Sequence, residues 1–82
     1  MMRLIDTKKE MSFVRIAEKY PDNQILVKIV EIDHDKGRET GIVLCIGDTR
    51  KELVDYSKSN DILEDTIILE GVNLMPVLRG IL

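Results

Sequence analysis

The sequence predicts a single small α+β domain spanning residues 1–82, with a three-stranded, mainly antiparallel sheet, two helices on one face and an apolar C-terminal tail. Three observations lead to this prediction. Two stretches rich in β-branched residues flank a polar turn that carries one glycine, as a hairpin does. Two Thr-x-x-Glu capping boxes mark the beginnings of helices. A chain of 82 residues is also too short for two independent cores. The predicted element order is α-β-β-α-β.

The first helix is predicted over residues 8–19. Thr7 can cap it, because the threonine hydroxyl can accept a hydrogen bond from the Glu10 N–H while the Glu10 side chain bonds back to the cap. Apolar residues then recur at helical spacing, at Phe13, Ile16, Ala17 and Tyr20. Pro21 ends the helix, since proline disfavours the helical conformation at the residue before it. Residues 1–6 are either a frayed arm or an added edge strand.

Two strands, 24–32 and 41–46, form the predicted hairpin. The first is a nearly continuous apolar run interrupted by Lys28 and Glu31, which indicates a strand at least partly covered on both faces. In the second strand the side chains alternate, which defines one face with Ile42, Leu44 and Ile46 and another with Val43 and Cys45. That second face is the one we expect the tail or a second subunit to cover.

The second half of the chain begins with the capping box Thr49–Glu52 and a helix predicted over residues 50–59. Asn60 can end this helix in the left-handed conformation that asparagine tolerates. A strand over residues 66–70 and the tail, residues 73–82, complete the chain.

Composition and charge argue against several functions. The net charge is −3 and acidic and basic residues are mixed along the chain, which argues against a nucleic-acid partner. Cys45 is the only cysteine, so no intrachain disulfide can form and a reducing, cytoplasmic location is expected. No apolar run approaches the roughly 18 residues that a transmembrane helix needs, so we expect no membrane association.

An acidic cluster at the hairpin is the one set of residues that could hold a divalent cation: Glu31, Asp33, His34, Asp35 and Glu39. Its spacing departs from an EF-hand, because Gly37 falls one position early and Leu44 replaces the bidentate glutamate. We therefore interpret residues 31–39 as a solvated hairpin tip whose charges protect a sheet edge. Cation binding is the alternative.

The remaining chemistry predicts no enzyme, no catalytic residue, no metal and no cofactor. Cys45, the candidate nucleophile, lies in the middle of an apolar strand, and burial there makes a thiol inert. His34 is the only histidine, and one cysteine with one histidine cannot complete a zinc site. The glycines match neither the P-loop nor the dinucleotide-binding fingerprint.

The C-terminal tail is the strongest indication of function. Its large apolar side chains are each worth roughly 1.5–3 kcal/mol when fully buried, so the tail either folds over the sheet or docks on a partner. Pro76 confines any strand there to an edge or a bulge. The candidate interface residues are Leu74, Met75, Val77, Leu78, Ile81 and Leu82.

Several short motifs carry a resemblance to known proteins: Tyr20-Pro21, an apolar strand, Gly41-x-Val43 and Gly47-Asp48-Thr49-x-x-Glu52-Leu53. Together they resemble small uncharacterised prokaryotic domains in which Tyr-Pro leads into a strand and Gly-Asp-Thr-x-x-Glu opens a helix. The resemblance covers residues 18–59 and implies a fold without an activity. Those domains have a Trp-Val-Ala type of strand where this chain has Ile25-Leu26-Val27.

The hairpin followed by Gly-Asp-Thr-x-x-Glu also resembles, more loosely, the partial RNase-H-like domain of HicB-type antitoxins. That family usually has a third strand and a Pro/Gly-rich stretch before the Gly-Asp-Thr, together with a separate DNA-binding segment. None of these is recognisable here, which argues against operator binding.

Taken together, these features predict a non-catalytic interaction domain in the cytoplasm. It would form a homodimer, or bind a small protein partner, through its sheet face, its tail or both. The alternative is an antitoxin-like or nucleic-acid-associated regulator. Its contacts would come from the basic residues of the two helices, Lys8, Lys9, Arg15, Arg50, Lys51 and Lys58.

Overall fold

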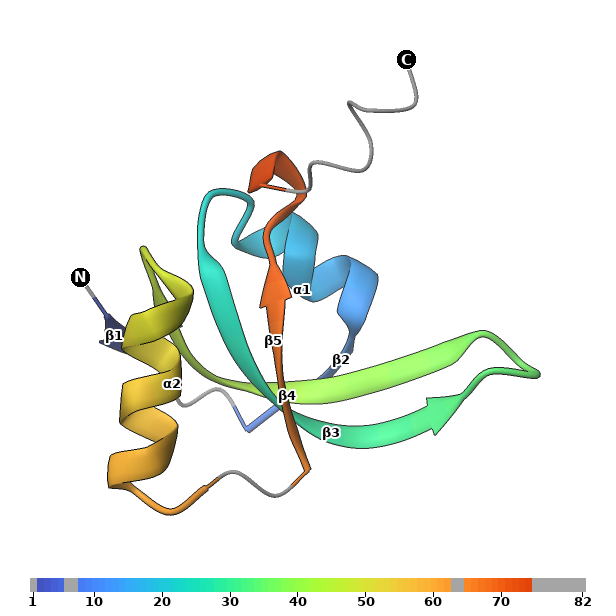
Figure 1. The fold of residues 1–82 in the computed structure, drawn as a ribbon. Coiled ribbons are helices and arrows are strands. Elements are labelled where there is room, and N and C mark those ends of the chain that lie inside the picture. Colours follow the sequence, from blue (N-terminus) through green and yellow to red (C-terminus); the bar gives the residue numbers. More distant parts are fainter. Residues whose placement is uncertain (1, 6–7, 63–64, 75–82) are drawn as a thin grey trace.

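The structure, a computed structural model, describes residues 2–5, 8–62 and 65–74. Two α-helices and an antiparallel sheet form a small α+β fold, as the sequence predicts (Figure 1). The sheet has five strands rather than three, because two short N-terminal segments join it. The elements in chain order are β1 (Arg3–Leu4), β2 (Glu10–Ser12), α1 (Phe13–Lys19), β3 (Gln24–Asp33), β4 (Arg38–Gly47), α2 (Arg50–Ser59), β5 (Thr66–Glu70) and the 3₁₀ turn η1 (Val72–Leu74).

The hairpin of β3 and β4 is the centre of the sheet, whose strand order is β1-β4-β3-β5 with β2 also on β4. Both strands extend further toward the turn than the predicted 24–32 and 41–46, and together they form the long arm in Figure 1. The turn is stabilised by bonds from Lys36 N to Asp33 Oδ1 at 3.2 Å and from Gly37 N to the His34 carbonyl at 3.3 Å. Gly37 has φ +64°, a conformation that glycine adopts without strain.

The N-terminal segment is an edge strand, which was one of its two predicted states. Arg3 pairs with Ile46 and Leu4 with Cys45, and Ile5 N donates to the Leu44 carbonyl at 2.9 Å. Residues 6–7 lie outside the described residues, so the predicted cap at Thr7 does too.

The first helix begins at Phe13, and the prediction of helix from residue 8 is wrong. Residues 10–12 instead form β2, whose Met11 lies opposite Gly41 of β4. The Thr40 hydroxyl donates to the Glu10 carboxylate at 2.6 Å, so Glu10 serves the sheet rather than a helix cap. Ser12 is the actual N-cap and accepts from Arg15 N at 3.2 Å. Pairing with an open strand edge therefore outweighs the local capping signal.

The second helix has the predicted bounds, Arg50–Ser59, and its capping box is confirmed. Glu52 N donates to Thr49 Oγ1 at 3.3 Å, and Thr49 N donates to Glu52 Oε1 at 3.1 Å. The predicted left-handed Asn60 is wrong: Asn60 has φ −107°, and Asp61 takes the positive φ of 54° one residue later. β5 also has its predicted bounds.

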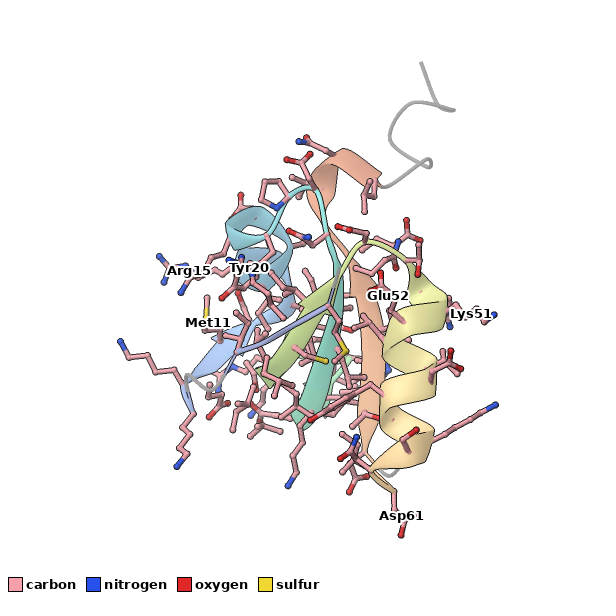
Figure 2. The ribbon with its side chains drawn as sticks, turned by 90° about the vertical axis from the view of Figure 1, so that its left-hand side faces the viewer. Met11, Arg15, Tyr20, Lys51, Glu52 and Asp61 are labelled. Atoms are coloured by element: carbon pink, nitrogen blue, oxygen red, sulfur yellow. The ribbon has the colours of Figure 1, made fainter. Side chains whose placement is uncertain are left out.

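The two helices lie on opposite faces of the sheet (Figure 2). On one face Ile16 of α1 packs in a cluster with Ile25, Val27, Val43 and Ile46. On the other face Leu53 of α2 packs with Leu26 and Cys45. The prediction that both helices cover one face is therefore wrong.

A β-bulge at Leu44 explains why the sequence pattern gave the wrong faces. Leu26 lies opposite Cys45 and the next residue, Val27, lies opposite Val43, so Leu44 is an extra residue in β4. The bulge exchanges the faces of the sheet that the β4 side chains occupy on either side of Leu44. Val43 consequently packs in the α1 cluster, whereas Cys45 packs in the α2 cluster, and the predicted shared face of these two residues does not exist.

Candidate functional site

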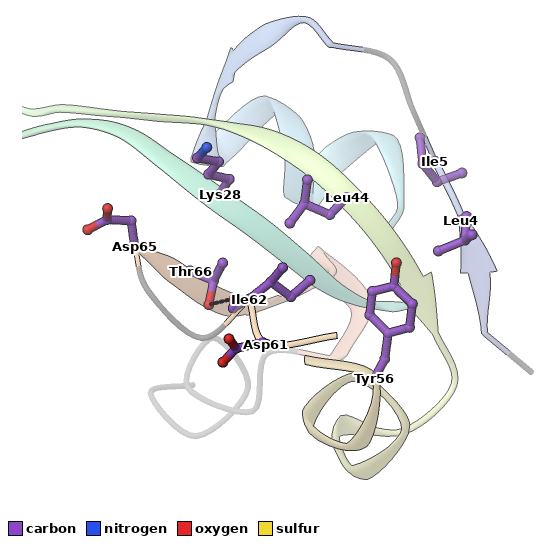
Figure 3. A pocket seen from close by; sticks show the side chains of 9 residues that line it. All are labelled: Leu4, Ile5, Lys28, Leu44, Tyr56, Asp61, Ile62, Asp65 and Thr66. Atoms are coloured by element: carbon purple, nitrogen blue, oxygen red, sulfur yellow. Dashed lines mark hydrogen bonds between the residues drawn. The ribbon is translucent and has the colours of Figure 1, made fainter. Parts of the chain in front are cut away.

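An open cleft of about 750 Å³ lies on the α2 side of the sheet (Figure 3). Its walls come from β1, from the sheet and from the connection between α2 and β5. The lining residues are Leu4, Ile5, Lys28, Leu44, Tyr56, Asp61, Ile62, Asp65 and Thr66.

Local hydrogen bonds hold the α2–β5 side of the cleft in place. Ile62 N donates to the Ser57 carbonyl at 3.0 Å, and the Thr66 hydroxyl donates to the Ile62 carbonyl at 3.3 Å. Asp61 and Asp65 have φ values of 54° and 55°, so the chain turns sharply at both residues. The turn directs the Ile62 side chain toward Tyr56 and the apolar cluster beneath α2.

The cleft combines an apolar floor with charged groups at its rim. Leu44, Tyr56 and Ile62 form the floor and pack against the α2 cluster. Lys28 comes from β3, while Asp61 and Asp65 come from the connection between α2 and β5 (Figure 3). The cleft can therefore hold an apolar group between charges of both signs.

Cys45 and His34, the candidate catalytic residues, lie far apart in the fold. Cys45 is fully buried under α2, whereas His34 lies in the exposed turn of the hairpin. Burial raises the pKa of the Cys45 thiol from its ordinary 9.0 to about 11. Within the described part of the chain, no three His, Cys, Asp or Glu side chains gather to hold a metal ion. The acidic hairpin, residues 31–39, lies within that part.

The buried thiol gives a testable pH dependence. Burial keeps the thiol neutral to a higher pH in the folded chain than in the unfolded chain. Cys45 therefore stabilises the fold fully below pH 9 and loses this contribution as pH rises toward 11. We therefore expect the urea midpoint to fall between pH 9 and 11, and to fall less in Cys45→Ala. We also expect a thiol reagent to modify Cys45 at neutral pH only after unfolding. Rapid modification of the folded chain would contradict this account.

Of the predicted interface residues, Leu74 is described and lies in η1, where its N–H donates to the Gly71 carbonyl at 2.9 Å. Met75, Val77, Leu78, Ile81 and Leu82 lie outside the described residues, so the role of the tail stays a prediction. Sequence reasoning missed the cleft itself. The adjacent apolar residues Leu4 and Ile5 were the available signal that the N-terminal segment contacts the body of the domain.

Basic residues near α1 line a shallow hollow together with acidic ones. The residues are Lys9, Glu10, Met11, Arg15, Glu18 and Lys19. Glu10 and Glu18 offset the potential of the cations, so this hollow lacks the single-sign charge that attracts a phosphate backbone. Lys19 also lies over the ring of Tyr20, with its ammonium 5.8 Å from the ring centroid.

Comparison of the chain with protein-family models, curated proteins and solved structures gave no match. Among the described residues, neither helix has the length and apolar character needed to cross a membrane.

Proposed function

We propose that this protein is a non-catalytic interaction module that works as a homodimer in the cytoplasm. One observation carries the proposal: the sheet is larger than the two helices that cover it. Ile32, Val30 and Ile67 keep 43%, 48% and 38% of their surface exposed, on strands whose inner residues are fully buried. Burying such side chains against a partner is favourable at roughly 25 cal/mol per Å² of apolar surface.

A second copy of the chain is the partner that these features favour. A domain of this size buries a smaller fraction of its surface on folding than a large domain does, so association adds stability that the monomer lacks. Two-fold homodimers are also the commonest assemblies of soluble proteins. The mixed charges around α1 do not favour the alternative, a nucleic-acid-associated regulator.

The test is the mass of the protein in solution, measured by size-exclusion chromatography with light scattering over a wide range of concentration. We expect a mass twice that of one chain, moving toward the monomer only on strong dilution. A monomer at every concentration would refute the homodimer. Retention on heparin at physiological salt would instead support the nucleic-acid alternative, because non-specific phosphate contacts weaken steeply with salt.

A further inference from the structure

We propose that the two copies associate by antiparallel pairing of their β5 strands, with a two-fold axis at Ile68, so that one sheet continues through both molecules. This inference rests on the homodimer proposed above and identifies its contact surface. It follows from the position of β5, from the direction of its backbone groups and from the order of its side chains.

β5 is an edge strand with few of the features that usually protect an edge. It is the last strand in the sheet order, and within the described residues it pairs with β3 alone. Its five residues, Thr-Ile-Ile-Leu-Glu, contain no lysine or proline, and its register with β3 has no bulge.

The opposite edge of the sheet is built differently. It consists of two short strands, β1 and β2, of two and three residues, with a break between them. Lys8 in that break has φ 51°, and the edge also carries Arg3 and Lys9. Short, interrupted and cationic edges resist pairing with another chain, so of the two edges that the described strands form, β5 is the one open to it.

The hydrogen bonds of the β3–β5 ladder determine which backbone groups of β5 face outward. Ile29 N donates to the Asp65 carbonyl at 2.6 Å, and Gly71 N donates to the Asn23 carbonyl at 2.9 Å. Because the direction of these groups alternates along an antiparallel strand, Ile67 and Leu69 also bond toward β3. The N–H and C=O groups of Ile68 and Glu70 therefore point away from the sheet.

An axis at Ile68 gives the antiparallel register that overlaps all five residues of β5. Ile68 then faces Ile68 of the second copy, and the two residues exchange two backbone hydrogen bonds. The same axis places Ile67 opposite Leu69, and Thr66 opposite Glu70, in the second copy. Apolar residues thus face apolar residues across the junction, and no two like charges lie directly opposite each other.

There is room for the side chains that this register brings in. Directly opposite residues of paired strands project on the same face, so Ile68 of the second copy lies on the α2 side. A hollow of about 250 Å³ is present there, lined by Leu26, Arg50, Val54, Ser57, Thr66, Ile67 and Ile68. On the α1 side, pairing would cover Ile67, which is 38% exposed in the single chain.

Cysteine cross-linking tests the register. Ile67 and Leu69 of different copies form a non-hydrogen-bonded pair, whose Cα atoms lie about 4.5 Å apart and within reach of a disulfide. The two Ile67 residues lie diagonally, at about 7–8 Å, which is too far. A mixture of Ile67→Cys and Leu69→Cys chains should therefore give roughly tenfold more disulfide dimer than either variant alone. Fully buried Cys45 should not compete.

A charge substitution gives a second, independent readout. Ile67→Lys should raise the dissociation constant of the dimer at least tenfold, because it puts two cations about 7–8 Å apart at the junction. Val14→Lys is the control, because Val14 is 69% exposed on α1 and lies outside the exposed sheet residues, so it should leave the constant unchanged. Far-UV circular dichroism verifies that both variants are folded.

The outcomes separate this inference from the homodimer itself. A dimer whose cysteine mixture links no better than each variant alone, or one that Ile67→Lys and Val14→Lys affect equally, would overturn β5 pairing and leave self-association standing. A wild-type chain that is monomeric at every concentration would overturn both.

Discussion

Replacing Gly71 by alanine is expected to lower the free energy of unfolding by about 3 kcal/mol, the upper end of the usual cost of overpacking. A Cβ atom at this position would come within 3.0 Å of backbone atoms of Tyr20 and Pro21. Those atoms cannot rotate away as a side chain can. Two hydrogen bonds of 2.9 Å also hold the segments together, from Gly71 N to the Asn23 carbonyl and from Asn73 N to the Pro21 carbonyl.

Gly47→Ala is the matched control for Gly71→Ala. Its Cβ would meet the Leu53 Cδ2 atom at 3.3 Å, and a side-chain atom can shift by the few tenths of an ångström that this contact requires. We expect the urea midpoint to fall much further for Gly71→Ala than for Gly47→Ala at an unchanged slope. Equal losses would show that the close approach of residue 71 to the turn before β3 does not matter.

Leu53→Ala is expected to cost about 2–5 kcal/mol, because Leu53 is fully buried and its truncation leaves a cavity between α2 and the sheet. The total stability of a small domain is about 5–15 kcal/mol, so this loss is a large part of it. Urea denaturation measures the loss. Val54→Ala on the same helix, where the side chain is half-buried, should cost clearly less.

A double-mutant cycle of Leu53 and Ile16 tests whether the two helices pack on separate faces of the sheet. These residues belong to separate clusters on opposite faces of the sheet, so the effects of Leu53→Val and Ile16→Val should add to within about 0.5 kcal/mol. A larger interaction energy in the double-mutant cycle would mean that the two helices share one core.

The sequence was sufficient for elements whose local signals agree with their tertiary role. The Thr49–Glu52 capping box, the polar turn and the apolar run of residues 66–70 each predicted an element that the fold contains. Thr7 and Glu10 have the same spacing as the second box, yet Glu10 belongs to a strand, because the outer edge of β4 was available for pairing. That edge is formed by residues some thirty positions later, which a local pattern cannot represent.

The faces of the sheet were not predictable for a related reason. A single extra residue, Leu44, reverses the alternation in β4, and nothing in the run Ile-Val-Leu-Cys-Ile distinguishes the residue that bulges. The predicted face shared by Val43 and Cys45, opposite the two helices, therefore does not exist. The cleft escaped prediction because its walls come from three distant segments, β1, β3–β4 and the α2–β5 connection.

The composition of the two apolar clusters has a consequence for how the chain folds. The α1 cluster is completed by Ile5 and Leu69, and the α2 cluster by Met2 and Ile68, so each layer contains residues from both ends of the described chain. No contiguous fragment of the sequence can therefore form one complete layer and leave the other for later. Folding should accordingly be all-or-none, with neither layer persisting as a stable intermediate once the other is lost.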